Sequence, residues 1–323
     1  MARSLPSASS DVPCTLLGRH SYVFTIQYDG TDYSGWQLQA GSGHKTIQGH
    51  VESSLSTVLR HDRLKLRVCG AGRTDKGVHA LGNVAQFYSD SLLDPLEQKL
   101  ESKLNGLLPH DIRVKGGSLV RTSPDFMITV SATAKTYVYS IDSNTFSNPL
   151  TRRFSMYTGP RLLDIDRMKE AALLFIGTHD FLQLSNRSIE ERNPVKTIQQ
   201  MEVSDPDEEG IMRVTVKGDG FLYKQVRHMV GLLIAVGQGS VDAGLITELL
   251  QMGSQQLPGL HGITRGYRIA DAKGLMLKNV EFLPRAFNPL TLLYPDRDHD
   301  EHGRLVEVSG PSLRRQGFVD PDF

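Results

Sequence analysis

The sequence has no uninterrupted apolar run of about 18 residues, the length that a membrane-spanning helix needs, so no such span is expected. Only two cysteines occur, Cys14 and Cys69, which is too few for a disulfide framework and indicates a reducing compartment. No spacing of Cys and His is typical of a zinc site. Apolar residues make up 39% of the 323 residues, enough for the core of one large domain or two.

Neither sign of charge is in excess, because 36 basic residues balance 36 acidic ones. A zero net charge argues against a generic polyanion binder, yet the placement of charge matters more than its sum. Basic residues outnumber acidic ones six to two in 60–76 and again in 112–153, whereas acidic residues gather in 202–209 and 296–307. This segregation permits a basic face on a neutral protein.

The most informative stretch is 69–80, Cys-Gly-Ala-Gly-Arg-Thr-Asp-Lys-Gly-Val-His-Ala, which we predict to be a loop between strands at 64–69 and 83–88. Its three glycines allow tight turns and a close approach of the backbone to a ligand. Loops at the ends of strands hold side chains at fixed positions above a sheet, and catalytic groups often lie there.

Three interpretations of this loop compete. A plain polar connection would use Asp75 as a turn residue, which is the more frequent meaning of an arbitrary Gly-Arg-Thr-Asp string. A phosphate cradle of the dinucleotide type would need a helix after the glycines, but the sequence that follows is strand-like. A catalytic carboxylate presented on a rigid loop would use Asp75 as a nucleophile or base.

Resemblance favours the third interpretation. Residues 72–80 are similar to the signature loop of the tRNA pseudouridine synthases of the TruA family, with Lys76 where the family usually has alanine. The resemblance extends over roughly 22–282, including Gly-Trp-Gln at 35–37, Asn-Gly-Leu-Leu-Pro-His-Asp-Ile at 105–112, Ala-Lys-Thr-Tyr-Val-Tyr at 134–139 and the stretch 220–231. The chain departs from the family at 126–129, where Phe-Met-Ile-Thr lacks the arginine of the usual Phe-x-Ala-Arg pattern.

The spacing of apolar residues is typical of β-strands in some segments of the chain and of α-helices in others. Apolar residues in alternation predict strands at 22–29, 131–141 and 274–282, and a hairpin of 196–203 with 211–217. Helical spacing predicts helices at 46–59 with Thr46 as N-cap, 95–108, 165–176 after Asp164, 220–236 and 247–252. We expect loops at 144–159 and 177–181, and we interpret His179 in the second as a structural or RNA-contacting residue.

This order of elements predicts an α+β fold. The resemblance implies the pseudouridine-synthase fold, a mixed, mainly antiparallel sheet flanked by helices, with two similar halves around a central catalytic cleft. We divide the chain into a disordered lead-in at 1–20, an N-terminal half of the catalytic domain at 21–143, a C-terminal half at 144–284 and an extension at 285–323.

The resemblance also implies isomerisation of uridine to pseudouridine in the anticodon stem-loop of tRNA, at positions 38–40. Asp75 would be the essential carboxylate, either attacking the sugar or taking a proton from it. Tyr137 would stack on the uracil and handle a proton, and Leu275 would pack under the base. Arg227 would pair with Asp75 and keep it ionised.

Four basic residues are candidates for contacts with RNA phosphates. Arg73 and Lys76 flank the expected carboxylate, and Arg152 and Arg153 follow from the segregation of basic charge. The target base lies inside a folded RNA, so the enzyme would have to flip it out.

The reaction requires no metal and no small-molecule cofactor, and none is expected. The family resemblance implies a homodimer that binds tRNA, without a membrane partner. We expect a cytoplasmic or nuclear protein; an organelle location stays open because 1–20 is rich in Ser, Pro and Ala, although it has little of the arginine pattern of a transit peptide. The competing hypotheses are a non-catalytic RNA-binding protein that kept the synthase fold, and a nucleotide-dependent enzyme that uses the glycine loop.

Overall fold

A computed structural model of the chain describes residues 20–39, 41, 43–94, 99–122, 126–186, 193–255 and 266–283. The predicted disordered lead-in, apart from His20, and the whole of the predicted C-terminal extension at 285–323 lie outside these residues, as does the predicted start of the second helix at 95–98. The proposed division into two halves at 143/144 stays a prediction.

The described strands form one mixed sheet, which is mainly antiparallel and confirms the α+β class. In spatial order its strands are β4 (Ile112–Val114), β1 (His20–Tyr28), β3 (His79–Ser89), β11 (Leu275–Phe282), β6 (Ala132–Asp142), β10 (Ile211–Gly218), β9 (Val195–Val203) and β8 (Gly177–Asp180). Three short strands extend it, namely β2 (Cys69–Gly70) beside β3, β5 (Val120–Arg121) beside β1, and β7 (Met156–Tyr157) beside β6.

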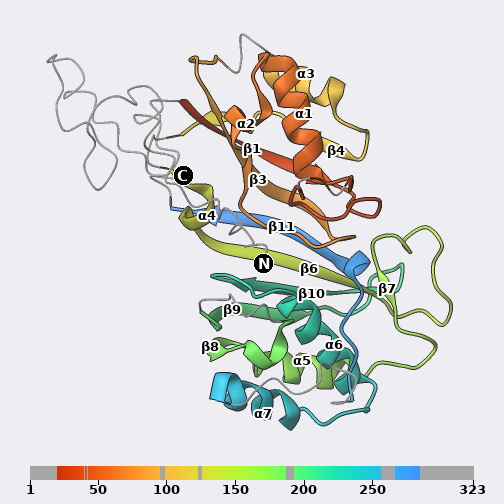
Figure 1. The fold of residues 1–323 in the computed structure, drawn as a ribbon. Helices are drawn as coiled ribbons and strands as arrows, with labels where there is room; N and C mark the ends of the chain where they lie inside the picture. The colour runs from red at the N-terminus through yellow and green to blue at the C-terminus, as the bar shows by residue number, and fades with distance from the viewer. Residues whose placement is uncertain are drawn as a thin grey trace, which may run out of the picture.

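The last described strand, β11, lies in the middle of the sheet and joins its two parts. It pairs in parallel with β3, where Met276 is opposite His79, and antiparallel with β6, where Leu277 is opposite Tyr137. Figure 1 shows β6 and β11 crossing the centre of the molecule side by side. Strand β6 belongs to the predicted N-terminal half, which ends at 143. In the sheet, however, it pairs with β10 and β11, which belong to the predicted C-terminal half.

Two groups of helices lie at opposite ends of this sheet (Figure 1). At the β1 end are α1 (Ile47–Leu59), α2 (Arg63–Leu66) and α3 (Leu100–Leu107), and at the β9 end are α5 (Ile165–Leu173), α6 (Gln225–Gly237) and α7 (Gly244–Met252). A single turn, α4 (Ile128–Ser131), precedes β6. Within the described residues, no helix has the length and apolar content needed to cross a membrane.

The predicted N-cap of α1 is confirmed, because Thr46 Oγ1 accepts a hydrogen bond from Gly49 N at 3.2 Å. Asp164 caps α5 in the same way, accepting from Arg167 N at 3.0 Å. Helix α6 is apolar on almost every side and is buried along nearly its whole length. Helix α6 is therefore the central core helix at the β9 end of the sheet.

Several sequence predictions of local structure are wrong. The loop expected at 144–159 contains the short strand β7, which pairs with β6. The first half of the expected strand at 64–69 is instead the end of the short helix α2, which Asp62 caps by accepting from Leu64 N at 2.8 Å. The helix expected from 220 begins only at Gln225, since Lys224 has a left-handed backbone with φ 61°. The loop expected at 177–181 contains strand β8, which pairs with β9.

Candidate active site

Asn83 holds the loop after β2 against the sheet. Its side chain is fully buried; Nδ2 donates to Gly72 O at 3.0 Å and Oδ1 accepts from Gly72 N at 3.0 Å. Nδ2 also donates to the Tyr28 hydroxyl at 3.2 Å, and that hydroxyl lies 2.8 Å from Thr74 Oγ1. Because Thr74 directly precedes Asp75, these hydrogen bonds fix the backbone that carries the carboxylate.

The Gly-Trp-Gln stretch packs against the same loop. Gly35 has φ 98°, and a Cβ there would lie 2.6 Å from Thr74 O, a distance that no real Cβ tolerates. Trp36 N donates to Thr74 O at 3.0 Å, and the Trp36 ring is buried beneath the loop. Gly35 and Trp36 therefore both support the loop that carries Asp75, Gly35 by allowing close approach and Trp36 by packing beneath it.

His79, at the end of the signature stretch, connects three segments. Its Nδ1 accepts from Gly30 N at 3.0 Å, and its Nε2 lies 3.1 Å from Lys273 O, which can only accept a hydrogen bond. Burial lowers the pKa of His79 more than the Asp29 carboxylate, 3.1 Å from Nδ1, raises it. A neutral imidazole with the proton on Nε2 satisfies both bonds. The role of His79 is therefore structural.

Asp75, on the loop after β2, and Arg227, in α6, lie close together although they are far apart in the sequence. Arg227, in the first turn of α6, places Nη1 3.7 Å from Asp75 Oδ2, and the exposed fractions of the two side chains are 15% and 22%. Arg227 Nε donates to Ala270 O at 2.7 Å, which orients the guanidinium. Burial raises the pKa of Asp75, and the charge of Arg227 opposes this without cancelling it. The carboxylate is therefore more basic than an ordinary aspartate.

Lys224 is a second cation at this carboxylate, and the sequence analysis missed it. Its charge is the next cause, after burial and Arg227, that acts on the pKa of Asp75, and it lowers that pKa. The left-handed backbone at Lys224 lies at the N-terminus of α6, which itself carries partial positive charge. The sequence places Lys224 three residues before Arg227, a spacing that could have indicated a second cation near Asp75. The prediction of a continuous helix from 220 did not include the turn at Lys224.

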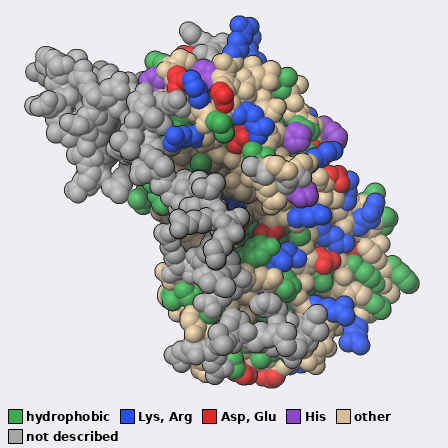
Figure 2. Space-filling view, in the orientation of Figure 1, with side chains coloured by type: hydrophobic (Ala, Val, Ile, Leu, Met, Phe, Trp, Pro, Cys, Tyr) green, Lys and Arg blue, Asp and Glu red, His purple; other side chains and the backbone are tan. Residues whose placement is uncertain are grey.

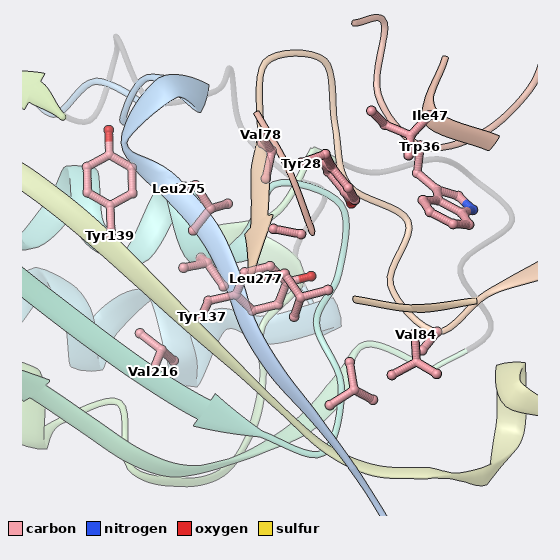
Figure 3. Close-up of a cluster of buried hydrophobic side chains, with 14 of the residues drawn as sticks. Tyr28, Trp36, Ile47, Val78, Val84, Tyr137, Tyr139, Val216, Leu275 and Leu277 are labelled. Atoms are coloured by element: carbon pink, nitrogen blue, oxygen red, sulfur yellow. The ribbon is translucent and has the colours of Figure 1, made fainter. Parts of the chain in front are cut away.

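Tyr137, at the centre of β6, lines the same pocket as Asp75 and Lys224 (Figure 3). Its ring is 9% exposed and meets the Phe221 ring edge to face, with centroids 5.2 Å apart. Leu277 lies opposite Tyr137 in the sheet, and Leu275 lines the pocket two residues earlier. Burial, with smaller effects from Tyr28 and Asp75, raises the pKa of Tyr137, so its hydroxyl stays protonated at neutral pH.

These side chains surround a pocket of about 700 Å³. Figure 2 shows the molecule hollowed between its upper and lower parts, with Lys and Arg side chains near the hollow. Among the residues that line the pocket are Arg73, Asp75, Lys76, Tyr137, Phe221, Lys224 and Leu275. A space of this size accommodates a nucleoside, and apolar, cationic and neutral polar side chains all contribute to its walls.

The sequence-predicted site residues thus divide into two sets. Arg73, Asp75, Lys76, Tyr137 and Leu275 all line the pocket. Arg227 is not among the lining residues but lies 3.7 Å from Asp75. Two others do not line the pocket. Arg152 is exposed, and Arg153 Nη2 lies 2.9 Å from Asp29 Oδ2 and 3.3 Å from Asp32 Oδ2.

A half-buried carboxylate on a loop fixed by hydrogen bonds, paired with an arginine and beside a buried tyrosine, defines an enzyme of acid-base or nucleophilic chemistry. The sequence model of the family described as tRNA pseudouridine synthase matches residues 25–121 and 171–283. The chain belongs to this family.

Curated relatives agree with this assignment. A protein named tRNA pseudouridine synthase A 2 from Bacillus cereus is 38% identical over 263 residues, covering 81% of this chain and 100% of the relative. A protein named tRNA pseudouridine synthase A 1 from Protochlamydia amoebophila is 42% identical over 220 residues, covering 67% and 82%. A solved structure titled Crystal Structure of a Cbf5-Nop10-Gar1 Complex contains a chain that matches at 14% identity with a TM-score of 0.29, covering 66% of this chain and 45% of that one.

Proposed function

We propose that this protein converts uridine to pseudouridine in the anticodon stem-loop of tRNA, at positions 38–40, with Asp75 as the catalytic carboxylate. The observation that carries the proposal is Asp75, held on the loop after β2 in the central pocket and paired with Arg227 of α6, with the charge of Lys224 also acting on it. The names of the curated relatives support tRNA as the substrate.

The reaction is an isomerisation in which the bond from ribose C1′ to uracil N1 breaks, the base turns, and a bond from C1′ to C5 forms. The proton leaves C5, and N1 takes up a proton. Asp75 can begin this reaction by attacking the sugar or by removing a proton from it, and the raised pKa improves it in either role. Arg227 and Lys224 stabilise its ionised form.

Tyr137 provides a ring on which the detached uracil can stack while it turns. Phe221 and Leu275 border the same space, so the base would turn between apolar surfaces that exclude water. The protonated Tyr137 hydroxyl can donate to a uracil oxygen or exchange a proton with the base. These roles follow from the positions of the three side chains around the pocket.

Arg73 and Lys76 line the pocket and are suited to contacts with RNA phosphates. We infer the same role for the exposed Arg152. Arg153 is already engaged with Asp29 and Asp32, so any phosphate contact there would have to compete with two carboxylates.

A tritium-release assay tests the proposed function. Transcribed tRNA labelled with tritium at uracil C5 should lose tritium on incubation with the wild-type protein, and Asp75→Asn should release none above background. Mapping of the product should place pseudouridine in the anticodon stem-loop. A wild-type protein that binds this tRNA tightly but releases no tritium would instead be a non-catalytic RNA-binding protein.

We also infer that the chain works as a homodimer. Three large apolar side chains of the segment after β6 are strongly exposed, namely Phe146 at 83%, Leu150 at 87% and Leu162 at 91%. Exposed apolar side chains in one segment favour an interaction surface. Sedimentation of the purified protein should give the mass of two chains, and replacement of the three residues by serine should give the mass of one.

A further inference from the structure

Two lysines lie on the Tyr137 face of the sheet, beyond the pocket. Lys135 precedes Tyr137 by two residues on β6, so both side chains point to the same face. Lys135 pairs with Gly218 of β10, and Gly218 pairs on its other side with Ile198 of β9. Lys196 precedes Ile198 by two residues and therefore shares this face as well. The register thus places Lys135 and Lys196 on the same face of the sheet, with β10 between their strands.

Glycines at 218 and 220 allow Phe221 and Lys196 to pack close to the backbone at the end of β10. A Cβ at Gly218 would lie 3.1 Å from Phe221 Cζ, so the Phe221 ring packs closely against this glycine. A Cβ at Gly220 would lie 3.7 Å from Lys196 Cδ, which shows that the Lys196 side chain crosses the turn beside Phe221. Phe221 therefore packs against both Gly218, which lies between the strands of the two lysines, and the Tyr137 ring.

The charge of this lysine pair is not compensated within the described part of the protein. Among the described residues, neither Lys135 nor Lys196 makes an ion pair with an acidic side chain. Lys135 is partly buried, and burial, followed by the neighbouring charge of Lys196, lowers its pKa. Two ammonium groups held together without a counter-ion destabilise the folded protein. An anion that binds between them would remove this cost.

We propose that Lys135 and Lys196 form a subsite for an RNA backbone phosphate next to the target uridine, a proposal that rests on the function proposed above. The distance supports this occupant. Two residues of an antiparallel strand span about 7 Å, so a phosphate at Lys135 lies within the reach of a nucleotide whose base stacks on Tyr137. The N-terminus of α6 adds positive potential on the same side of the sheet.

The test compares Lys135→Gln, Lys196→Gln and the double variant with Lys278→Gln, which changes an exposed lysine of the same sheet. Affinity for the tRNA transcript is measured against salt concentration, and KM and kcat are measured with the tritium-labelled substrate. Each lost phosphate contact in a single-stranded region reduces the slope of log affinity against log salt by about 0.7. We expect the double variant to lose about one such contact, with a higher KM and a kcat within a few-fold of wild type.

Two further measurements distinguish a phosphate subsite from a pair of lysines that only supports the fold. Lys135→Met should melt at the same or a higher temperature than wild type, because an uncompensated cation is removed; a structural lysine would give a lower melting temperature. Inorganic phosphate, exchanged for chloride at constant ionic strength, should compete with tRNA for the wild type more than for the double variant.

The proposal is overturned if the double variant keeps the salt slope and KM of Lys278→Gln. If phosphate raises the melting temperature of the wild type through these lysines while tRNA affinity is unaffected by their loss, the site binds a free anion and the RNA subsite is again overturned. A failure of the proposed function would look different, since the wild type itself would release no tritium whatever the salt slope.

Discussion

Arg227 divides one guanidinium between two acceptors, with Nε 2.7 Å from Ala270 O and Nη1 3.7 Å from Asp75 Oδ2. Ala270 N in turn donates to Arg227 O at 3.0 Å, so the backbone before β11 holds this residue from both ends. Because Nε is engaged, only the Nη atoms remain for Asp75, and the closest lies beyond hydrogen-bond length. Arg227 therefore acts on Asp75 as a fixed nearby charge.

Replacement of Arg227 should change the pH dependence of catalysis. Arg227 favours the ionised form of Asp75, so its loss raises the pKa of Asp75 further and a higher pH is needed to ionise the carboxylate. In single-turnover rates measured against pH, the acidic limb of Arg227→Ala should move to higher pH, with Arg227→Lys between it and wild type. A lower melting temperature with an unmoved acidic limb would limit Arg227 to its bond with Ala270.

Lys224→Gln should move the same limb in the same direction by a smaller amount, because Lys224 acts on Asp75 after burial and Arg227. Lys76→Gln is a matched control, since Lys76 also lines the pocket but is not among the causes that shift the pKa of Asp75. The control should raise KM and leave the acidic limb in place. Equal shifts for the two lysine variants would show a general effect of pocket charge.

Asp75→Asn should abolish turnover, by about 10⁴-fold or more, and should stabilise the protein at neutral pH. Burial raises the pKa of folded Asp75 above the ordinary value of 3.8, so its contribution to stability is complete below that value. This contribution is lost as pH rises through the folded pKa. The melting temperature of Asp75→Asn should therefore exceed that of wild type at pH 7, and the difference should vanish in acid.

Asp207→Asn is a control for this measurement, because its melting temperature should change in the opposite direction at pH 7. Hydrogen bonds from Ile211 N and from Arg213 lower the pKa of Asp207 in the folded protein. Its contribution to stability is present above the unfolded pKa and is lost as pH falls through the folded one. Asp207→Asn should therefore melt below wild type at pH 7. An Asp75→Asn variant that behaves in the same way would contradict a raised pKa at Asp75.

Tyr137→Phe separates stacking from proton transfer. The variant keeps the ring that packs against Phe221, so the affinity for tRNA should stay within about threefold of wild type. Loss of the hydroxyl should lower kcat about 100-fold, the lower end of general acid-base effects. Because burial raises the pKa of Tyr137, wild type should show no basic limb from this residue up to about pH 10, the ordinary pKa of tyrosine. An unchanged kcat would leave Tyr137 as a stacking surface alone.

Local pattern was enough to predict most strands and helices and the loop that carries Asp75. The alternation of 22–29 and the helical spacing of 46–59 correspond closely to β1 and α1. The error at 64–69 arose because an Asp62 cap outweighed the strand-like composition of a short segment. The late start of α6 depends on the left-handed Lys224, which no periodicity reveals because a single residue changes the backbone direction.

The missed site residues depend on pairings between segments far apart in the chain. Asn83 reaches Gly72 and Tyr28 only because β3 pairs with β2 and β1 in this register. Lys135 and Lys196 come together through Gly218, which lies between their strands. In each case the sequence contains an ordinary polar residue in a strand. The register of the sheet, which is set by tertiary packing, gives it a partner.

Asn83→Ala should lower both stability and rate. Its amide bonds both polar atoms of Gly72, and leaving them unpaired in the core should cost about 1–3 kcal/mol. The loop that carries Asp75 would then lose its fixed position, so kcat should fall more than KM rises. Asn105→Ala is the matched control, because Asn105 bonds both polar atoms of Val114 in the same way. It should lower the melting temperature and leave kcat unchanged; equal kcat losses would exclude a positioning role for Asn83.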